Sequence, residues 1–232
     1  MNKACFYVMT VDTGFAPNPF HGVCTLAACT PNHCKANLKE GDLIAGCFRS
    51  KGVSKVVYVM EVNEVLDLND YWRDSRFACK KPSKNGTPEE QAGDNIYYKD
   101  RSSNWHQDCK AGYHRDNSHV FKQDTESNRV FIGKQFVYFG VKAITLPKKF
   151  AKFLPNGQGI KYLKDDPKDF AAFSIWAFDR PKLGRLGMPR DWKGTLGCGV
   201  QACRRSVGAY RNSAHAGPER RLPGQRACDA IA

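Results

Sequence analysis

The sequence lacks any apolar run of the length that a membrane span requires. A transmembrane helix needs about 20 mostly apolar residues, and no window of the 232-residue chain approaches that length. The opening segment, MNKACFYVMTVDTG, also lacks a signal-peptide core, because Asp12 interrupts its apolar stretch. We therefore expect a soluble, cytoplasmic protein without a membrane partner, whose ten cysteines are mostly reduced thiols.

Familiar catalytic and metal-binding signatures are absent too. The chain has no GxGxxG motif, P-loop or nucleophile elbow, so nucleotide hydrolysis by those routes has no support. No CxxC pair occurs either. Residue types that zinc prefers do gather near the start of the chain, at spacings unlike those of zinc sites: His21, Cys24, Cys29, His33 and Cys34. Buried thiols explain these cysteines more simply, and we expect no metal and no cofactor.

The chain has instead a large surplus of positive charge. Its formal net charge is +13, and excess lysine and arginine attract phosphate groups by releasing condensed counterions. Nucleic acid, with DNA favoured, or a nucleotide is thus the first partner to expect. The alternative is that the charge only keeps the surface soluble.

Five segments rich in β-forming residues predict an α+β fold with a compact, mostly antiparallel sheet. They are Ala4 to Val11, Leu43 to Phe48, Lys55 to Glu64, Arg129 to Ile132 and Phe136 to Gly140. The second and third are expected to pair through a basic loop over residues 49–54.

A few helices should flank this sheet. Asp67 can cap a short helix from Leu68 to Arg73. Asp166 or Pro167 can start a second helix that reaches Phe178. Residues 80–93 are rich in proline, glycine and lysine and predict a surface loop, and residues 105–127 show little apolar period.

The composition changes after Trp192. Glycine, alanine and arginine dominate there without an apolar period, so we expect one domain over residues 1–192 and an arginine-rich flexible tail over residues 193–232. Such a tail can grip phosphate backbones or play no part in the folded domain.

Four blocks of sequence stand out together. They are DTGFAPNPFHGVCTLAAC at residues 12–29, GDLIAG and VVYVMEVNE within 41–64, YWRDSRF, KKP and GDNIYY within 71–98, and RVFIGKQFVYFG at 129–140, with GMPRDW closing at 187–192. They resemble the nucleotide modification associated domain 2 family of bacterial and phage proteins, predicted to act beside DNA-modification systems. The resemblance spans nearly all of residues 6–192, and the tail lies outside it.

The order of a GD turn, two strands and an aromatic pair also resembles the PUA-like barrels of the EVE and ASCH groups. This resemblance implies that the sheet forms a PUA-like small barrel, as the alternative to a compact antiparallel sheet. It also implies a basic cleft with an aromatic pocket that accepts one extruded base.

A base-binding site beside the TGFAPNPF loop is the site that these residues predict. Pro17 and Pro19 make this loop stiff and non-helical. The candidates are Phe15, Phe20 and Trp72 for stacking, and Asp12, Asn18, Asp94 and Asn95 for hydrogen bonds to a base edge. The alternatives are that the aromatic residues belong to the core and that the polar residues cap turns.

We expect the protein to recognise a modified base or nucleotide in a bacterial or phage DNA-modification system. The alternative is an enzyme that alters a base or nucleotide in the same pocket, with Asp12, Asp94 or His114 as acid or base. The other histidines and carboxylates considered match no catalytic motif: His106, His119, Asp108 and Asp116. A third possibility is an interaction subunit of a phage-defence complex.

Overall fold

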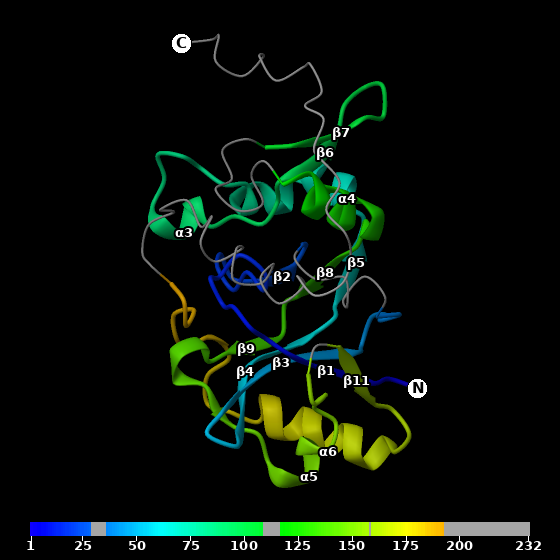
Figure 1. Cartoon of the computed structure of the whole chain (residues 1–232), viewed down its shortest axis with the longest axis vertical. Coiled ribbons are helices and arrows are strands. Elements are labelled where there is room, and N and C mark those ends of the chain that lie inside the picture. Colours follow the sequence, from blue (N-terminus) through cyan, green and yellow to red (C-terminus); the bar gives the residue numbers. More distant parts are fainter. Residues whose placement is uncertain (29–35, 109–116, 158, 193–232) are drawn as a thin grey trace, which may run out of the picture.

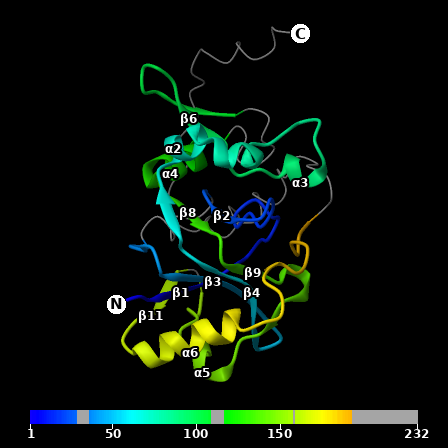
Figure 2. The same cartoon turned by 180° about the vertical axis from the view of Figure 1, so that it is seen from behind.

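The computed structural model describes residues 1–28, 36–108, 117–157 and 159–192 (Figure 1). The predicted tail, residues 193–232, lies outside these ranges. The elements are layered around one large sheet, with two helices on one face and two smaller sheets and several further helices on the opposite side (Figures 1 and 2). Within the described ranges, none of the helices combines the length and apolarity that a membrane crossing demands.

The large sheet is mostly antiparallel. Its strands are β1 (Ala4–Val8), β3 (Leu43–Ser50), β4 (Val53–Glu61), β9 (Phe136–Tyr138), β10 (Ile144–Thr145), β11 (Ile160–Leu163) and β12 (Gly184–Arg185). The order is β11-β1-β3-β4-β9-β12, and β10 also pairs with β4. Only β1 with β3 and β9 with β12 run parallel. The predicted α+β class with a mostly antiparallel sheet is confirmed.

This sheet does not close into a barrel. Among the strands that the structure describes, its outer members β11 and β12 pair only with β1 and β9. A barrel requires every strand to be paired on both sides, and β12, with two residues, ends the sheet. The PUA-like barrel is therefore not confirmed.

Two smaller sheets complete the β structure. β2 (Cys24–Leu26), β8 (Val130–Gly133) and β5 (Glu64–Leu66) pair antiparallel in the order β2-β8-β5. β6 (Tyr97–Lys99) and β7 (Trp105–Gln107) form an antiparallel hairpin at the end of the molecule away from the N-terminus (Figure 1).

The turn between β3 and β4 is tighter than the loop predicted over residues 49–54. The strands continue to Ser50 and Val53, and Lys51 and Gly52 make the turn with φ of 48° and 78°. Two consecutive positive φ values suit the right-handed twist of a two-residue hairpin. The hydrophobic pattern located both strands, but β3 ends two residues later than predicted, and β4 begins two residues earlier and ends at Glu61 instead of Glu64.

The two predicted helices occur with the expected bounds. α2 (Leu68–Arg73) is capped by Asp67, whose side chain accepts a hydrogen bond from the Asp70 amide. α6 (Pro167–Phe178) is capped by Asp166, with proline in the first turn. The other helical elements are η1 (Ser75–Lys80), α3 (Pro88–Gln91), α4 (Ser118–Ser127), η2 (Gly140–Lys142) and α5 (Lys148–Ala151). Of these, α3 and α4 interrupt segments that the sequence indicated as irregular.

Apolar side chains fill three clusters between these layers. One lies between the large sheet and α5 and α6, around Phe6, Phe150 and Phe173. The second lies on the other face of that sheet, and the third lies beneath α2 and β6, with Phe15 and Tyr71 among its members. The TGFAPNPF loop therefore lies over the third cluster and not in solvent.

Candidate functional site

Three of the predicted base-edge residues meet in one buried cluster. Asn18, Asp94 and Asn95 are each at most 1% exposed. The Asp94 carboxylate accepts hydrogen bonds from Thr25 Oγ1 at 2.7 Å and from the Tyr71 hydroxyl at 2.8 Å. The backbones of Asn18 and Thr25 bond in both directions, at 2.8 and 3.0 Å. The cluster thus joins the proline-containing loop to β2, to α2 and to the segment before β6.

The buried side chain of Lys80 holds this cluster together. Its Nζ donates to Asn18 Oδ1 at 2.8 Å and to the backbone carbonyls of Asn18, Phe20 and Val23 at 3.1, 2.8 and 2.8 Å. Burial lowers the pKa of Lys80, against the charge of Asp94, and burial raises the pKa of Asp94, against the charge of Lys80. The prediction of a surface loop from residue 80 was wrong at this residue, which is 0% exposed.

Asp12 lies apart from that cluster and contacts the last described residues of the chain. Its carboxylate accepts from the Tyr138 hydroxyl and, at 2.9 Å, from the Arg190 amide. Its own amide donates to Asp191 Oδ2 at 2.8 Å, and the Asp191 amide donates back to the Asp12 carbonyl at 2.8 Å. Burial raises the pKa of Asp12, and the hydrogen bond from Tyr138 opposes that shift. These bonds fasten the GMPRDW segment to the loop after β1.

The two phenylalanines of the loop are part of the interior. Phe15 and Phe20 are each 1% exposed. The Phe20 ring lies 5.1 Å from the ring of Trp192 and 5.3 Å from the guanidinium carbon of Arg185. In this arrangement neither phenylalanine presents an open ring face to a base.

Trp72 is the predicted stacking residue that reaches the surface, and it belongs to a column of three rings. Its ring stacks on Tyr98 with centroids 4.6 Å apart and planes at 22°, and Tyr98 stacks on His106 at 5.3 Å and 21°. Lys81 Nζ lies 4.1 Å from the Trp72 centroid. We call Trp72, Tyr98 and His106 the aromatic column. Its His106 end has 44% of the side chain exposed, and its Trp72 end is covered by Lys81.

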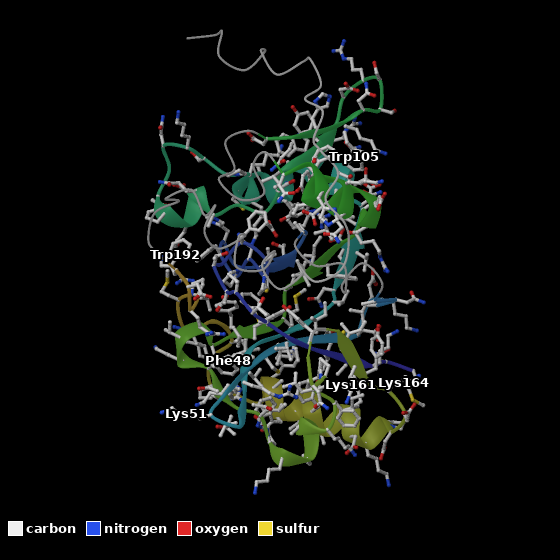
Figure 3. The ribbon with its side chains drawn as sticks, in the orientation of Figure 1. Phe48, Lys51, Trp105, Lys161, Lys164 and Trp192 are labelled. Carbon is white, nitrogen blue, oxygen red and sulfur yellow. The ribbon has the colours of Figure 1, made fainter. Side chains whose placement is uncertain are left out.

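The β6–β7 hairpin explains why these rings meet. Tyr98 and His106 are direct cross-strand partners, so their side chains project from the same face of the hairpin. Asp100 shapes the turn by accepting from the amides of Ser102 and Asn104 at 2.8 and 2.9 Å. It also bonds His106 Nε2 at 2.8 Å, and that bond is the main cause that lowers the pKa of Asp100 to about 2. Figure 3 shows Trp105, next to His106, in the upper part of the molecule, and Lys161 and Lys164 in its lower half.

Comparison with known proteins is decisive for the family. A family model described as nucleotide modification associated domain 2 matches residues 1–196. The chain belongs to this family. No curated protein and no solved structure matches the chain.

The motifs that resemble the nucleotide modification associated domain 2 family converge in the buried cluster. DTGFAPNPF contributes Asn18, KKP contributes Lys80, and GDNIYY contributes Asp94 and Asn95. These segments are far apart in the sequence, and hydrogen bonds between them hold them in one cluster of the domain.

Several of the other candidate metal ligands and catalytic acids lie outside the described ranges. These are Cys29, His33, Cys34, His114 and Asp116. Within the described ranges, Cys24 is buried, and burial raises the pKa of its thiol to about 12. His119 is exposed on α4, and His106 is bound to Asp100 as a member of the aromatic column.

Sequence reasoning found Trp72 but missed Tyr98, His106 and Lys81 as its neighbours. The available signal was the pair of aromatic segments, IYY and WH, on either side of the polar turn DRSSN. Read as a hairpin, that pattern places Tyr98 and His106 on the same face. The position of Lys81 over Trp72 depends on the course of η1, which ends just before it, and no sequence pattern indicates this position.

Proposed function

We propose that this domain binds a nucleic-acid strand or a nucleotide and recognises a modified base, with the aromatic column as its stacking surface. The observation that carries the proposal is the geometry of the column: three rings stacked in sequence with neighbouring centroids 4.6 and 5.3 Å apart, a lysine at one end and an exposed imidazole at the other. Aromatic rings beside cations are the combination that binds bases and phosphates without requiring a particular sequence.

Further cations lie on the elements that carry the aromatic column. Lys99 Nζ lies 4.6 Å from the ring of Trp105, on the other face of the same hairpin. Arg73, in the last turn of α2, and Arg101, in the hairpin turn, are exposed. A strand whose base stacks at the His106 end therefore meets positive charge on both flanking elements, as a phosphate backbone requires.

For the six buried candidates, base contact stays a prediction, and it requires the TGFAPNPF loop to move. They are Asp12, Phe15, Asn18, Phe20, Asp94 and Asn95. In the described arrangement we assign Phe15, Asp94 and Asn95 a positioning role, because their hydrogen bonds and packing hold α2 and β6, the elements of the aromatic column.

The experiment measures fluorescence anisotropy of single-stranded DNA oligonucleotides that differ only in one base, which is either unmodified or carries a methyl or hydroxymethyl group. We expect binding at low ionic strength, weakening with added salt, and a preference for one modified base. Tyr98→Ala removes the ring that supports His106 and should weaken binding by about 5- to 150-fold, the loss expected if the base no longer stacks, since stacking contributes about 1–3 kcal/mol per base.

Tyr162→Ala is the matched control. Tyr162 is also a half-buried tyrosine, but it lies on β11 of the large sheet, with Lys3 at 4.9 Å over its ring. Its replacement should leave DNA affinity unchanged. Absence of binding at low ionic strength, or equal losses in the two variants, would contradict the proposal.

One observation favours the enzyme alternative: burial raises the pKa of both Asp12 and Asp94, as in many acid–base residues. Mass spectrometry of the oligonucleotide's nucleosides after incubation with the protein and cell extract separates the two functions. A reader returns every nucleoside unchanged, whereas an enzyme produces a new one that is lost in Asp94→Asn.

A further inference from the structure

Arg190 differs from the other described arginines that lie over aromatic rings. Together with Arg190, these arginines have guanidinium carbons 3.8–5.3 Å from a ring centroid. They are Arg76, Arg129, Arg180, Arg185 and Arg190. In the first four, the guanidinium also donates hydrogen bonds to carboxylates or backbone carbonyls. Nη1 of Arg190 is buried and has no hydrogen-bond partner within the described ranges.

The surroundings of Arg190 hold its guanidinium in place. The ring of Phe48, at the end of β3, lies 3.8 Å from the guanidinium carbon, and the Arg190 amide is bonded to Asp12 Oδ2. Stacking on one face leaves the N–H groups, which lie in the guanidinium plane, to point away from the ring. The residue is thus fixed at its backbone and at its side chain.

The nearby carboxylates accept from other donors. Asp12 accepts from Tyr138 and from the Arg190 backbone, and Asp191 Oδ2 accepts from the Asp12 amide. Burial raises the pKa of Asp12, and the hydrogen bonds from Tyr138 and the Arg190 amide and the charge of Arg190 oppose that shift. A buried cationic donor without an acceptor is unfavourable and points to an oxyanion ligand.

We infer that Arg190 binds an oxyanion of the phosphate class, supplied by a nucleotide or a nucleic-acid strand, in the corner between Phe48 and the loop at Asp12. The guanidinium fork matches two oxygens of a phosphate group. The family's association with nucleotide modification favours a nucleotide phosphate. The inference goes beyond the proposed function, because it holds whether or not the aromatic column stacks on a base.

The first test titrates protein labelled with ¹⁵N-arginine with sodium phosphate, at constant ionic strength kept with sodium chloride. We expect one guanidinium Nε–Hε resonance to shift saturably with phosphate and not with chloride, and Arg190→Lys should remove that resonance and weaken phosphate binding at least about tenfold, since an ammonium lacks the fork. No saturable shift of this resonance up to about 10 mM phosphate would overturn the inference.

Arg180→Lys is the matched control. Arg180 also lies over aromatic rings, but its Nε and Nη2 donate to the carbonyls of Ala177 and Trp176. Phosphate affinity should be unchanged in this variant. If Arg190→Lys fails to fold, Phe48→Leu removes the stacking ring and keeps the guanidinium, and the same wild-type resonance should then bind phosphate more weakly. Retained phosphate affinity in whichever of the two variants, Arg190→Lys or Phe48→Leu, is folded would overturn the inference.

Competition identifies the source of the phosphate group. Thymidine 5′-monophosphate should displace phosphate if a free nucleotide is the ligand, and a single-stranded oligonucleotide should do so if a strand is. Thymidine, which has no phosphate, should not compete. Acetate binding as tight as phosphate binding, or competition by neither nucleotide nor strand, would overturn the assignment. Tyr98→Ala should leave phosphate affinity unchanged, so failure of the proposed function and failure of this inference are distinguishable.

Discussion

Lys80→Met should destabilise the domain far more than Lys81→Met, although the two lysines are neighbours. Lys80 is 0% exposed and its ammonium donates to four oxygens of the loop that includes Asn18. Lys81 is half-buried, with its ammonium over the ring of Trp72. Methionine keeps the length and most of the volume of lysine, so the comparison isolates the charge and its hydrogen bonds.

The magnitude follows from the contacts. Each buried oxygen that loses its donor costs about 1–3 kcal/mol, and removal of one partner from a buried charged network typically costs about 3–5 kcal/mol in total. Methionine avoids the desolvation that lowers the pKa of Lys80, which offsets part of this loss. We expect a net loss of about 3 kcal/mol, or about 6–12 °C in Tm at about 2–4 °C per kcal/mol for a domain of this size.

Thermal unfolding followed by circular dichroism, with urea unfolding as the second measurement, tests this expectation. Lys81→Met should change stability by less than about 1 kcal/mol, and it should weaken binding of single-stranded DNA because the cation beside Trp72 is lost. Equal stabilities of the two variants would refute the view that Lys80 holds the cluster together.

Three other outcomes are expected. Gly140→Ala should lower the free energy of unfolding by about 2–4 kcal/mol, as thermal unfolding would measure. The reason is that φ of Gly140 is +53° and an added Cβ would lie 2.0 Å from the backbone oxygen of Met188. Gly157→Ala is the control, because an added Cβ there would have no atom within 4 Å. The thiol of Cys24, whose pKa burial raises to about 12, should resist iodoacetamide near neutral pH, whereas exposed Cys79 reacts, as peptide mass spectrometry would measure. Because burial raises the pKa of Asp94, the native state binds this proton more tightly than the unfolded chain, so the contribution of Asp94 to the free energy of unfolding should fall as pH rises above 3.8. Urea titrations of Asp94→Asn should show a smaller fall, and an unchanged pH dependence would contradict the assignment.

Local patterns predicted the long strands β1, β3 and β4, the strands β8 and β9, and the helices α2 and α6. The valine-rich run of β4 and the capped helices α2 and α6 were identified from residue type and spacing, because their signals are contained within the segments. The predicted loop over residues 80–93 failed at Lys80, since burial of a lysine depends on acceptors that lie about 60 positions earlier in the sequence. Local polarity carries no information about such distant partners.

The candidate site was predictable only in part for the same reason. Trp72 was chosen as an aromatic residue beside a loop, but its stacking on Tyr98 and His106 requires the pairing of β6 with β7 and their approach to α2. Phe15 and Phe20 were chosen by the same rule, yet their rings lie in the interior. A sequence supplies residue types near a loop, and packing decides which of them face solvent.

The sequence by itself determined the family, the α+β class, the positions of the main strands and two capped helices, and the surplus of positive charge. Each depends on composition or on residues within a few positions of one another. Only the tertiary structure decided that the sheet stays open, that Lys80 and Asp94 are buried in one cluster, and that Trp72, Tyr98 and His106 form a column. These features depend on contacts between distant segments, where exclusion of water and the pairing of buried polar groups select one arrangement among many.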